Sequence, residues 1–137
     1  MYYCKMYSFE TKLRARYGET DQMGYVYYGV YAQYYEVGRV ELLRSLGISY
    51  RELEEEGFAL PVVNFEINYK KAAYYDDELT IRTTIKELPS ARIEFHYATY
   101  NTEKELLNSG RVTLVFVDKK SKKPCFTPEI IISKLKE

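Results

Sequence analysis

Apolar and polar residues alternate from residue 7 to residue 17, and this period of two predicts a half-buried β-strand. The positions on its apolar side are Tyr7, Phe9, Leu13, Ala15 and Tyr17. The alternation stops at Gly18, and the stretch from Gly18 to Gly24 predicts a loop.

The spacing of apolar residues changes to a helical one from about Val30 to Leu46, which predicts one long helix. The positions that set this spacing are Tyr31, Tyr34, Tyr35, Gly38, Leu42 and Leu46. Val37, Val40 and Leu43 widen the apolar surface, so we expect this helix to be covered on much of its circumference.

Two shorter helices are predicted from their end signals. Gly47 suits the end of the long helix, and Ser49 followed by Glu52 three residues later matches a capping box that starts a second helix. Gly57 is expected to end that second helix. Pro128 suits the first turn of a short amphipathic helix at the end of the chain.

Four further strands are predicted in the second half of the chain. Residues 63–70, 79–86 and 93–100 alternate between apolar and polar positions, and residues 101–104 read as a turn. Residues 112–117 are apolar on both faces, so we expect this strand to be central or covered twice. The order predicts an α+β fold in which a five-stranded antiparallel sheet packs on one long helix.

Length and composition narrow the class of protein. A chain of 137 residues is the size of one domain, so we expect residues 1–137 to fold as a single unit. Basic and acidic residues both number 20, which argues against a nucleic-acid binder, since such a protein needs a basic excess. The 16 tyrosines with no tryptophan suit a half-wet cleft or an interface.

Cysteine, histidine and the start of the chain add three expectations. Cys4 and Cys125 are too few for a disulfide framework, and His96 is the single histidine, so we expect no catalytic metal. The first residues lack the apolar core of a signal peptide, and no stretch is apolar enough to span a membrane. We therefore expect a cytoplasmic protein.

The segment from Tyr17 to Tyr31 carries the chemistry that the sequence suggests. Glu19 and Asp21 lie just before the predicted long helix, whose first turn offers unpaired N–H groups and a positive dipole end. A carboxylate at such a place serves as a general base or a nucleophile. The simpler interpretation is that Asp21 caps a turn near the helix start, which aspartate favours.

This arrangement resembles the hotdog fold, and more narrowly the 4-hydroxybenzoyl-CoA thioesterase family with its YbgC-like acyl-CoA thioesterases. The family motif has a tyrosine, two acids, a glycine, a valine and a second tyrosine, followed by an aromatic-rich helix with Glu-x-x-Arg. The corresponding residues here are Tyr17, Glu19, Asp21, Gly24, Val26 and Tyr27, and then Glu36 and Arg39. Residues 75–81 also look like the family's entry to its third strand, and the resemblance covers about residues 8–120.

The resemblance implies hydrolysis of an acyl-CoA thioester, or of an acyl carrier protein thioester, without a cofactor. It assigns the catalytic carboxylate to Asp21 and the polarisation of the thioester carbonyl to the backbone amide of Tyr28. Gly24 and Tyr27 would belong to the substrate-binding part of the motif. It also implies homodimers that join two sheets edge to edge with active sites between subunits, and assembly into homotetramers.

Two departures from the family pattern limit what is carried over. Glu19 stands where aspartate is usual, and Tyr28 stands where many YbgC-like members have histidine. The side chain of Tyr28 therefore inherits no role, whereas its backbone amide remains, since every residue except proline supplies one. Glu19 is interpreted as a solvated loop residue, with a second acid or an orienting group as the alternative.

Several other residues are weaker candidates. Glu36, expected to be partly buried, is in reach of Arg39 for a structural ion pair on the helix, with an auxiliary role in orienting water as the alternative. Lys70 and Lys71 end one predicted strand and Arg92 begins another, so these three are the expected cations for the phosphates of coenzyme A.

Two rival functions stay open at this stage. A hotdog hydratase or dehydratase would need histidine beside an acid on the helix, and His96 instead lies in a predicted strand. A non-catalytic acyl-CoA-binding domain would not need Asp21. Both rivals are less well supported than a thioesterase.

Overall fold

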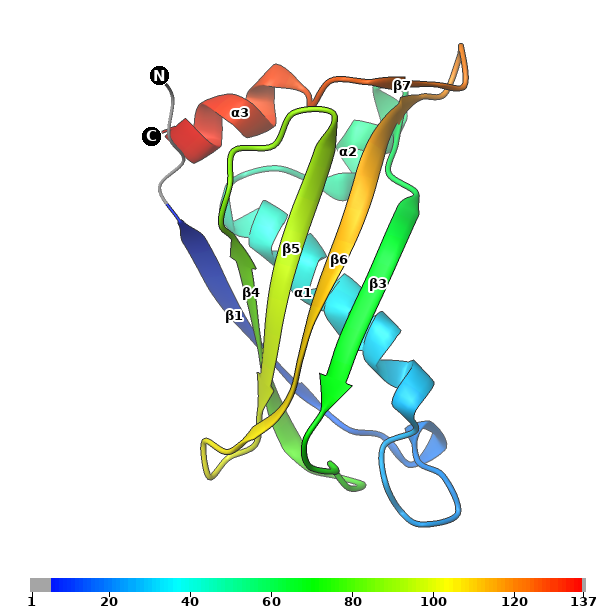
Figure 1. Ribbon diagram of the computed structural model, residues 1–137, viewed down its shortest axis with the longest axis vertical. Coiled ribbons are helices and arrows are strands. Elements are labelled where there is room, and N and C mark those ends of the chain that lie inside the picture. Colours follow the sequence, from blue (N-terminus) through cyan, green and yellow to red (C-terminus); the bar gives the residue numbers. More distant parts are fainter. Residues whose placement is uncertain (1–5, 137) are drawn as a thin grey trace.

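The computed structural model describes residues 6–136 and shows one long helix inside a curled sheet (Figure 1). In chain order the elements are β1 (Tyr7–Arg14), the 3₁₀ turns η1 (Tyr17–Glu19) and η2 (Tyr28–Val30), α1 (Tyr31–Ser45), α2 (Tyr50–Glu55), β2 (Phe58–Ala59), β3 (Val62–Tyr69), β4 (Glu78–Ile85), β5 (Arg92–Tyr100), β6 (Leu106–Asp118), β7 (Lys123–Cys125) and α3 (Glu129–Lys136).

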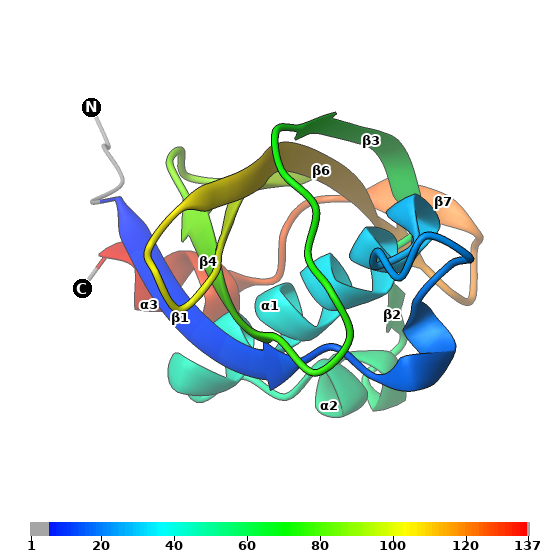
Figure 2. The same ribbon diagram turned by 90° about the horizontal axis from the view of Figure 1, so that it is seen from below.

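The five long strands lie side by side in the order β1, β4, β5, β6, β3, and every neighbouring pair is antiparallel. The sheet curls around α1, which is clearest when the molecule is seen from below (Figure 2). The predicted α+β architecture is thus confirmed. The short strands β2 and β7 also pair with β6 and were not predicted, because each is only two or three residues long.

One side of α1 fills the inside of the curled sheet. Tyr35 and Leu42 of the helix and Ile81 and Phe95 of the sheet are all fully buried in one core. The expected coverage of much of the helix circumference was wrong in part, because the sheet wraps only one side. Val37 faces away from the buried side and is 41 % exposed.

Strand β6 is central, as predicted, since it lies between β5 and β3. It is 13 residues long and begins six residues before the predicted strand. The first half of β6 was not predicted, because Asn108, Ser109 and Gly110 interrupt the apolar pattern. Asn108 is nevertheless fully buried, and its Oδ1 accepts hydrogen bonds from Tyr35 Oη (2.6 Å) and Thr99 Oγ1 (2.9 Å).

The helix ends agree with the predicted signals. Ser49 Oγ accepts a hydrogen bond from the Glu52 N–H at 3.3 Å, and Gly47 and Gly57 both have positive φ angles just after a helix. Strand β1 ends at Arg14, before the predicted Tyr17, because the chain tightens into the η1 turn. Cys4 lies outside the described residues.

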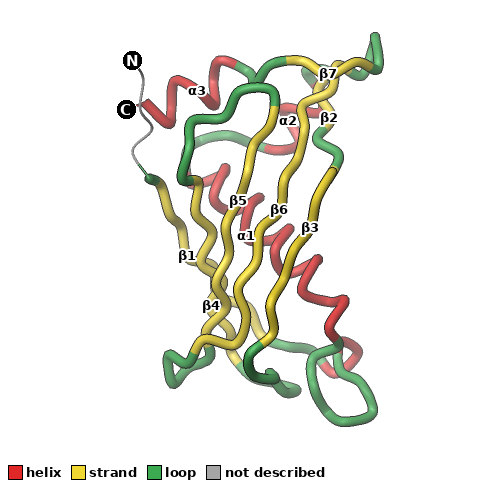
Figure 3. Tube along the Cα trace, viewed as in Figure 1, coloured by secondary structure: helices red, strands yellow, loops and turns green. Residues whose placement is uncertain are grey.

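Three of the connecting segments gather at one end of the molecule (Figure 3). The segment between β1 and α1, the loop between β3 and β4 and the turn between β5 and β6 all lie there. Within residues 6–136, none of the helices has the length and apolar character needed to cross a membrane.

Candidate active site

Asp21 lies at the head of a tight turn that its own carboxylate organises. Its Oδ1 accepts hydrogen bonds from the backbone N–H groups of Met23 (2.9 Å) and Tyr25 (3.2 Å). Gly24, at φ +79°, closes the turn by donating its N–H to the Asp21 carbonyl at 3.0 Å. Asp21 is exposed, and its Oδ2 makes no hydrogen bond to any of residues 6–136. One carboxylate oxygen therefore fixes the turn while the other faces solvent.

The start of the long helix offers two unpaired backbone donors. The N–H groups of Tyr28 and Gly29, in η2, make no hydrogen bond within the described part of the chain. Tyr69 Oη donates to the Tyr28 carbonyl at 2.9 Å, so strand β3 holds this turn in place. Free N–H groups at a helix start attract negative charge, because the helix dipole adds to their own partial charge.

A hollow of about 300 Å³ brings the carboxylate and this helix start together. Its lining residues are Asp21, Tyr25, Val26, Tyr28, Tyr31, Tyr69, Lys70, Lys71 and Ala72. Four of the residues predicted from the sequence therefore line a single hollow: Asp21, Tyr28, Lys70 and Lys71. Gly24 and Tyr27 adjoin it but do not line it; the Tyr27 ring packs on that of Tyr28 with centroids 4.7 Å apart.

Tyrosines form the walls of this hollow. The ring of Tyr69 meets those of Tyr28 and Tyr31 edge to face, with centroids 6.5 and 5.9 Å apart. Burial raises the pKa of Tyr31 to about 12, with further contributions from Tyr69 and Asp77, so its hydroxyl stays protonated at neutral pH. Tyr69 was missed in the sequence, although it directly precedes Lys70 and Lys71 at the strand end.

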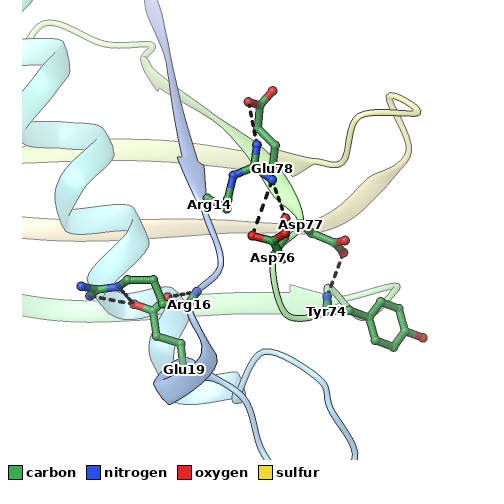
Figure 4. A network of polar contacts seen from close by, with 7 residues as sticks. All are labelled: Arg14, Arg16, Glu19, Tyr74, Asp76, Asp77 and Glu78. Carbon is green, nitrogen blue, oxygen red and sulfur yellow. Dashed lines mark hydrogen bonds and ion pairs between the residues drawn. The ribbon is translucent and has the colours of Figure 1, made fainter.

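Glu19 is a structural anchor, and the interpretation of a solvated loop residue was wrong. Its side chain is only 12 % exposed. Oε1 accepts from the Arg16 N–H at 2.8 Å, and Oε2 accepts from Arg16 Nη2 at 3.1 Å (Figure 4). Oε1 also accepts from Tyr34 Oη at 2.8 Å. Burial acts to raise the pKa of Glu19, but these hydrogen bonds and the Arg16 charge outweigh it and lower the pKa.

The expected ion pair between Glu36 and Arg39 does not form between these two described residues. Glu36, expected to be partly buried, is exposed on the outer side of α1, whereas Arg39 is buried on the inner side near Tyr97. Residues three apart are neighbours on a helix, but here the edge of the buried face runs between them. Glu36 does not line the hollow that contains Asp21.

The two lysines of the hollow differ in their surroundings. Lys71 forms an ion pair with Glu105, and this hydrogen bond raises the pKa of Lys71. The Lys70 side chain is exposed and makes no ion pair or hydrogen bond within residues 6–136. Lys70 is thus the uncommitted cation at the site.

Within one chain, Arg92 lies far from this hollow, so the expected nearness of its strand end to the start of α1 is not found there. Strands β3 and β5 both run antiparallel to β6, so they point in the same direction. The end of β3 therefore lies level with the end of β5 at Tyr100, and Lys70 donates its N–H to the Leu107 carbonyl there. Arg92 begins β5 eight residues earlier, roughly 26 Å away along the strand.

His96 and metal ligands do not contribute to the hollow. His96 points to the face of β5 opposite Phe95 and Tyr97, which are buried against α1, and its Nε2 lies 2.8 Å from Glu94 Oε1. Residues 6–136 contain no cluster of three or more His, Cys, Asp or Glu side chains that could hold a metal ion.

Comparisons of the sequence with known proteins show which family it belongs to. The sequence model of the thioesterase-like superfamily matches residues 15–135. A Bacillus subtilis (strain 168) protein named putative acyl-CoA thioesterase YneP is 36% identical over 119 residues, 87% of this chain and 86% of that protein. The acyl-CoA thioesterase YbgC of Haemophilus influenzae is 32% identical over 122 residues, 88% of this chain and 89% of its own length.

Solved structures show the same fold. DHNA-CoA thioesterase from Staphylococcus aureus superposes with a TM-score of 0.84 at 33% identity, covering 87% of this chain and 80% of that one. The hypothetical protein TT1821 from Thermus thermophilus superposes with a TM-score of 0.86 at 32% identity, covering 92% of this chain and 95% of that one. These likenesses confirm the hotdog fold.

Proposed function

Because this chain belongs to the thioesterase-like superfamily, we propose that it is an acyl-CoA thioesterase, which hydrolyses its substrate to a carboxylic acid and free coenzyme A. The observation that carries the proposal is the single hollow that holds both the Asp21 carboxylate and the turn with the unpaired Tyr28 N–H. A base and an anion-binding site facing one cavity are what hydrolysis of a thioester needs.

Asp21 is the proposed general base. Its free Oδ2 takes a proton from a water molecule as the water oxygen bonds to the thioester carbon. Its Oδ1 stays bonded to the N–H groups of Met23 and Tyr25, so the carboxylate is held in orientation during the reaction. The turn-capping interpretation and the catalytic one are therefore compatible, because they use different oxygens. Direct attack by Oδ2 to give a transient anhydride is the alternative use of the same atom.

The backbone amide of Tyr28 is the proposed oxyanion donor. When water adds, the thioester oxygen becomes negative, and the N–H of Tyr28 and that of Gly29 are the free donors beside the hollow. Collapse of this intermediate breaks the carbon–sulfur bond and releases coenzyme A as its thiolate. Such a donor contributes roughly 10²–10³-fold to kcat, because it is oriented before the charge develops.

Lys70 is the proposed contact for a phosphate of coenzyme A. It lines the hollow, is exposed, and its charge is not used by any residue in the described range. Lys71 lines the same hollow but already pairs with Glu105, so its contribution is expected to be smaller.

The proposed enzyme is a homodimer joined through β3. This strand pairs only with β6 in the described residues, which leaves its other edge open. Four large apolar side chains on this strand are between 39% and 49% exposed: Val62, Val63, Phe65 and Tyr69. Exposed apolar side chains at an open sheet edge favour association with another chain. Tyr69 belongs both to this edge and to the hollow, so a partner subunit would cover the site.

The proposal is tested with purified protein and a panel of aromatic, short-chain and long-chain acyl-CoA thioesters, following release of free thiol. We expect turnover of at least one member, and Asp21→Asn should lower kcat about 10²–10⁴-fold. The amide oxygen of asparagine can still accept the N–H groups of Met23 and Tyr25, so the turn should remain intact.

Asp118→Asn is the matched control. Asp118 Oδ1 also accepts two backbone N–H groups, those of Lys120 (2.8 Å) and Ser121 (3.2 Å), in a turn outside the hollow. This variant should keep wild-type kcat. No thiol release from any substrate would contradict the thioesterase, and equal activity of the two variants would remove Asp21 from the mechanism.

A further inference from the structure

The loop between β3 and β4 contacts the chain just before the segment that carries Asp21. Ala15 N–H donates to the Asp77 carbonyl, and Asp76 N–H donates to the Ala15 carbonyl, both at 2.9 Å. Ala15 is 1 % exposed, so this contact lies in the interior. The start of the Asp21 segment is thereby fixed to residues 76 and 77.

The same loop also contacts the chain just after Asp21. Val26 N–H donates to the Ala73 carbonyl at 2.8 Å, and Tyr25 and Tyr74 form an antiparallel bridge. The rings of Tyr25 and Tyr74 meet edge to face with centroids 5.3 Å apart. Both ends of the Asp21 segment therefore rest on one loop.

Asp77 closes that loop with its side chain. Its Oδ2 accepts a hydrogen bond from the Tyr74 N–H at 2.8 Å, and its own N–H donates to the Tyr74 carbonyl at 3.1 Å (Figure 4). Tyr74 is thus held on both backbone groups by one residue. Aspartate favours this role because its short side chain can bond a nearby backbone N–H.

A continuous chain of contacts runs from this loop to the Asp21 carboxylate. Tyr25, which pairs with Tyr74, donates its N–H to Asp21 Oδ1 at 3.2 Å and accepts from the Asp21 N–H at 2.8 Å. We propose that Asp77 is a positioning residue: its carboxylate fixes Tyr74, Tyr74 fixes Tyr25, and Tyr25 orients the carboxylate of Asp21. This inference rests on the catalytic role proposed above for Asp21.

Asp77 could also act through its charge, since it lines a neighbouring hollow of about 530 Å³ and contributes, after burial and Tyr69, to the raised pKa of Tyr31. Two variants of Asp77 distinguish the positioning role from an effect of its charge. Asp77→Ala removes both acceptor and charge, whereas Asp77→Asn removes the charge but keeps an oxygen that accepts from the Tyr74 N–H. Positioning requires the acceptor alone.

The experiment measures kcat and KM for a turned-over acyl-CoA at a temperature where every variant is fully folded. We expect Asp77→Ala to lower kcat about 10–100-fold with KM changed less than about threefold, since small misplacement of a reacting group has effects of this size. Asp77→Asn should restore most of kcat. Asp76→Asn makes the same change one residue earlier, where the carboxylate faces Arg14 at 3.9 Å, and should match the wild type.

Amide hydrogen exchange gives a second measurement that does not depend on turnover. In Asp77→Ala the N–H groups of Tyr25 and Val26 should exchange about tenfold faster, with wild-type exchange in Asp76→Asn. If the wild type hydrolysed no acyl-CoA, the proposed function would fail, and unchanged exchange at Tyr25 would separately overturn the positioning role.

Two kinetic results would also overturn the inference. One is wild-type kcat in Asp77→Ala, and the other is an equal loss in Asp77→Asn, which would assign the effect to charge. If Asp77→Ala does not fold, Asp77→Ser replaces it, because a serine hydroxyl caps the same turn more weakly. Its kcat should then fall below that of Asp77→Asn; equal values would count against positioning.

Discussion

The proposed oxyanion donor is a backbone atom, so it can be removed only by proline. Tyr27 has φ −61° and ψ 134°, an extended conformation that suits a residue before proline, and Tyr28 is the first residue of η2. Tyr28→Pro therefore deletes the unpaired N–H at small structural cost. Tyr28→Ala removes the same ring but keeps the N–H.

We expect kcat of Tyr28→Pro to lie about 10²-fold below that of Tyr28→Ala, with similar melting temperatures. Tyr28→Phe should be mild, because only the exposed hydroxyl is lost. Steady-state kinetics with thermal unfolding checks all three. Equal kcat for the proline and alanine variants would show that this N–H does not stabilise the transition state.

Glu19 gives a prediction on stability and pH. Because the pKa of Glu19 in the folded protein is lowered below its ordinary value of 4.5, its charge stabilises the fold above that value. This contribution is lost as pH falls through the lowered folded pKa. Glu19→Gln should therefore cost about 1–3 kcal/mol at pH 7, and its difference from wild type should shrink in acid.

Urea unfolding between pH 3 and pH 7 measures this difference directly. Glu55→Gln, an exposed glutamate of α2, is the control and should follow the wild type throughout. A difference between Glu19→Gln and wild type that stayed constant down to pH 3 would mean that the charge of Glu19 contributes nothing.

Between elements, the approach of α1 to β4 depends on Gly38. A Cβ added at Gly38 would lie 2.4 Å from Thr83 Oγ1 and 3.1 Å from Ile81 Cγ2. Thr83 is buried, and its hydroxyl has no hydrogen-bond partner within the described range. Removing this hydroxyl should therefore cost little stability. The two positions are therefore coupled through one contact.

We expect Gly38→Ala to destabilise the protein by about 1–3 kcal/mol through overpacking, and Thr83→Ala to relieve most of that cost in the double variant. Alanine also favours the helix over glycine by up to about 1 kcal/mol, which offsets part of the overpacking cost in Gly38→Ala. A double-mutant cycle in urea measures the coupling. Additive effects would show that Thr83 is not the obstacle.

Local patterns predicted the helices and most strands because each of these buries one regular face. The position of Asp21 and Tyr28 at one hollow was also predictable, since both lie within one short motif. The distance of Arg92 from the hollow within one chain could not be predicted, because it depends on the relative direction of β3 and β5, which no local pattern encodes. The role of Glu19 depends on Tyr34, 15 residues later, and could be seen only in the folded chain.

At the scale of the whole molecule, the open edge of β3 predicts self-association. Val63→Lys places a charge at this edge, where Val63 is 49% exposed, and should shift the protein towards monomers. Val37→Lys, at a 41% exposed valine on α1, is the matched control and should keep the wild-type state. Sedimentation equilibrium measures both. A wild-type protein that is monomeric at micromolar concentration would contradict the proposed dimer.

The tyrosine walls of the hollow also have an optical consequence. The chain has 16 tyrosines and no tryptophan, so tyrosine fluorescence is not lost by energy transfer to an indole ring. Tyr28, Tyr31 and Tyr69 line the hollow of the proposed site, and we expect a ligand bound there to change their emission. The fluorescence of the unlabelled protein would thus report occupancy of the proposed site.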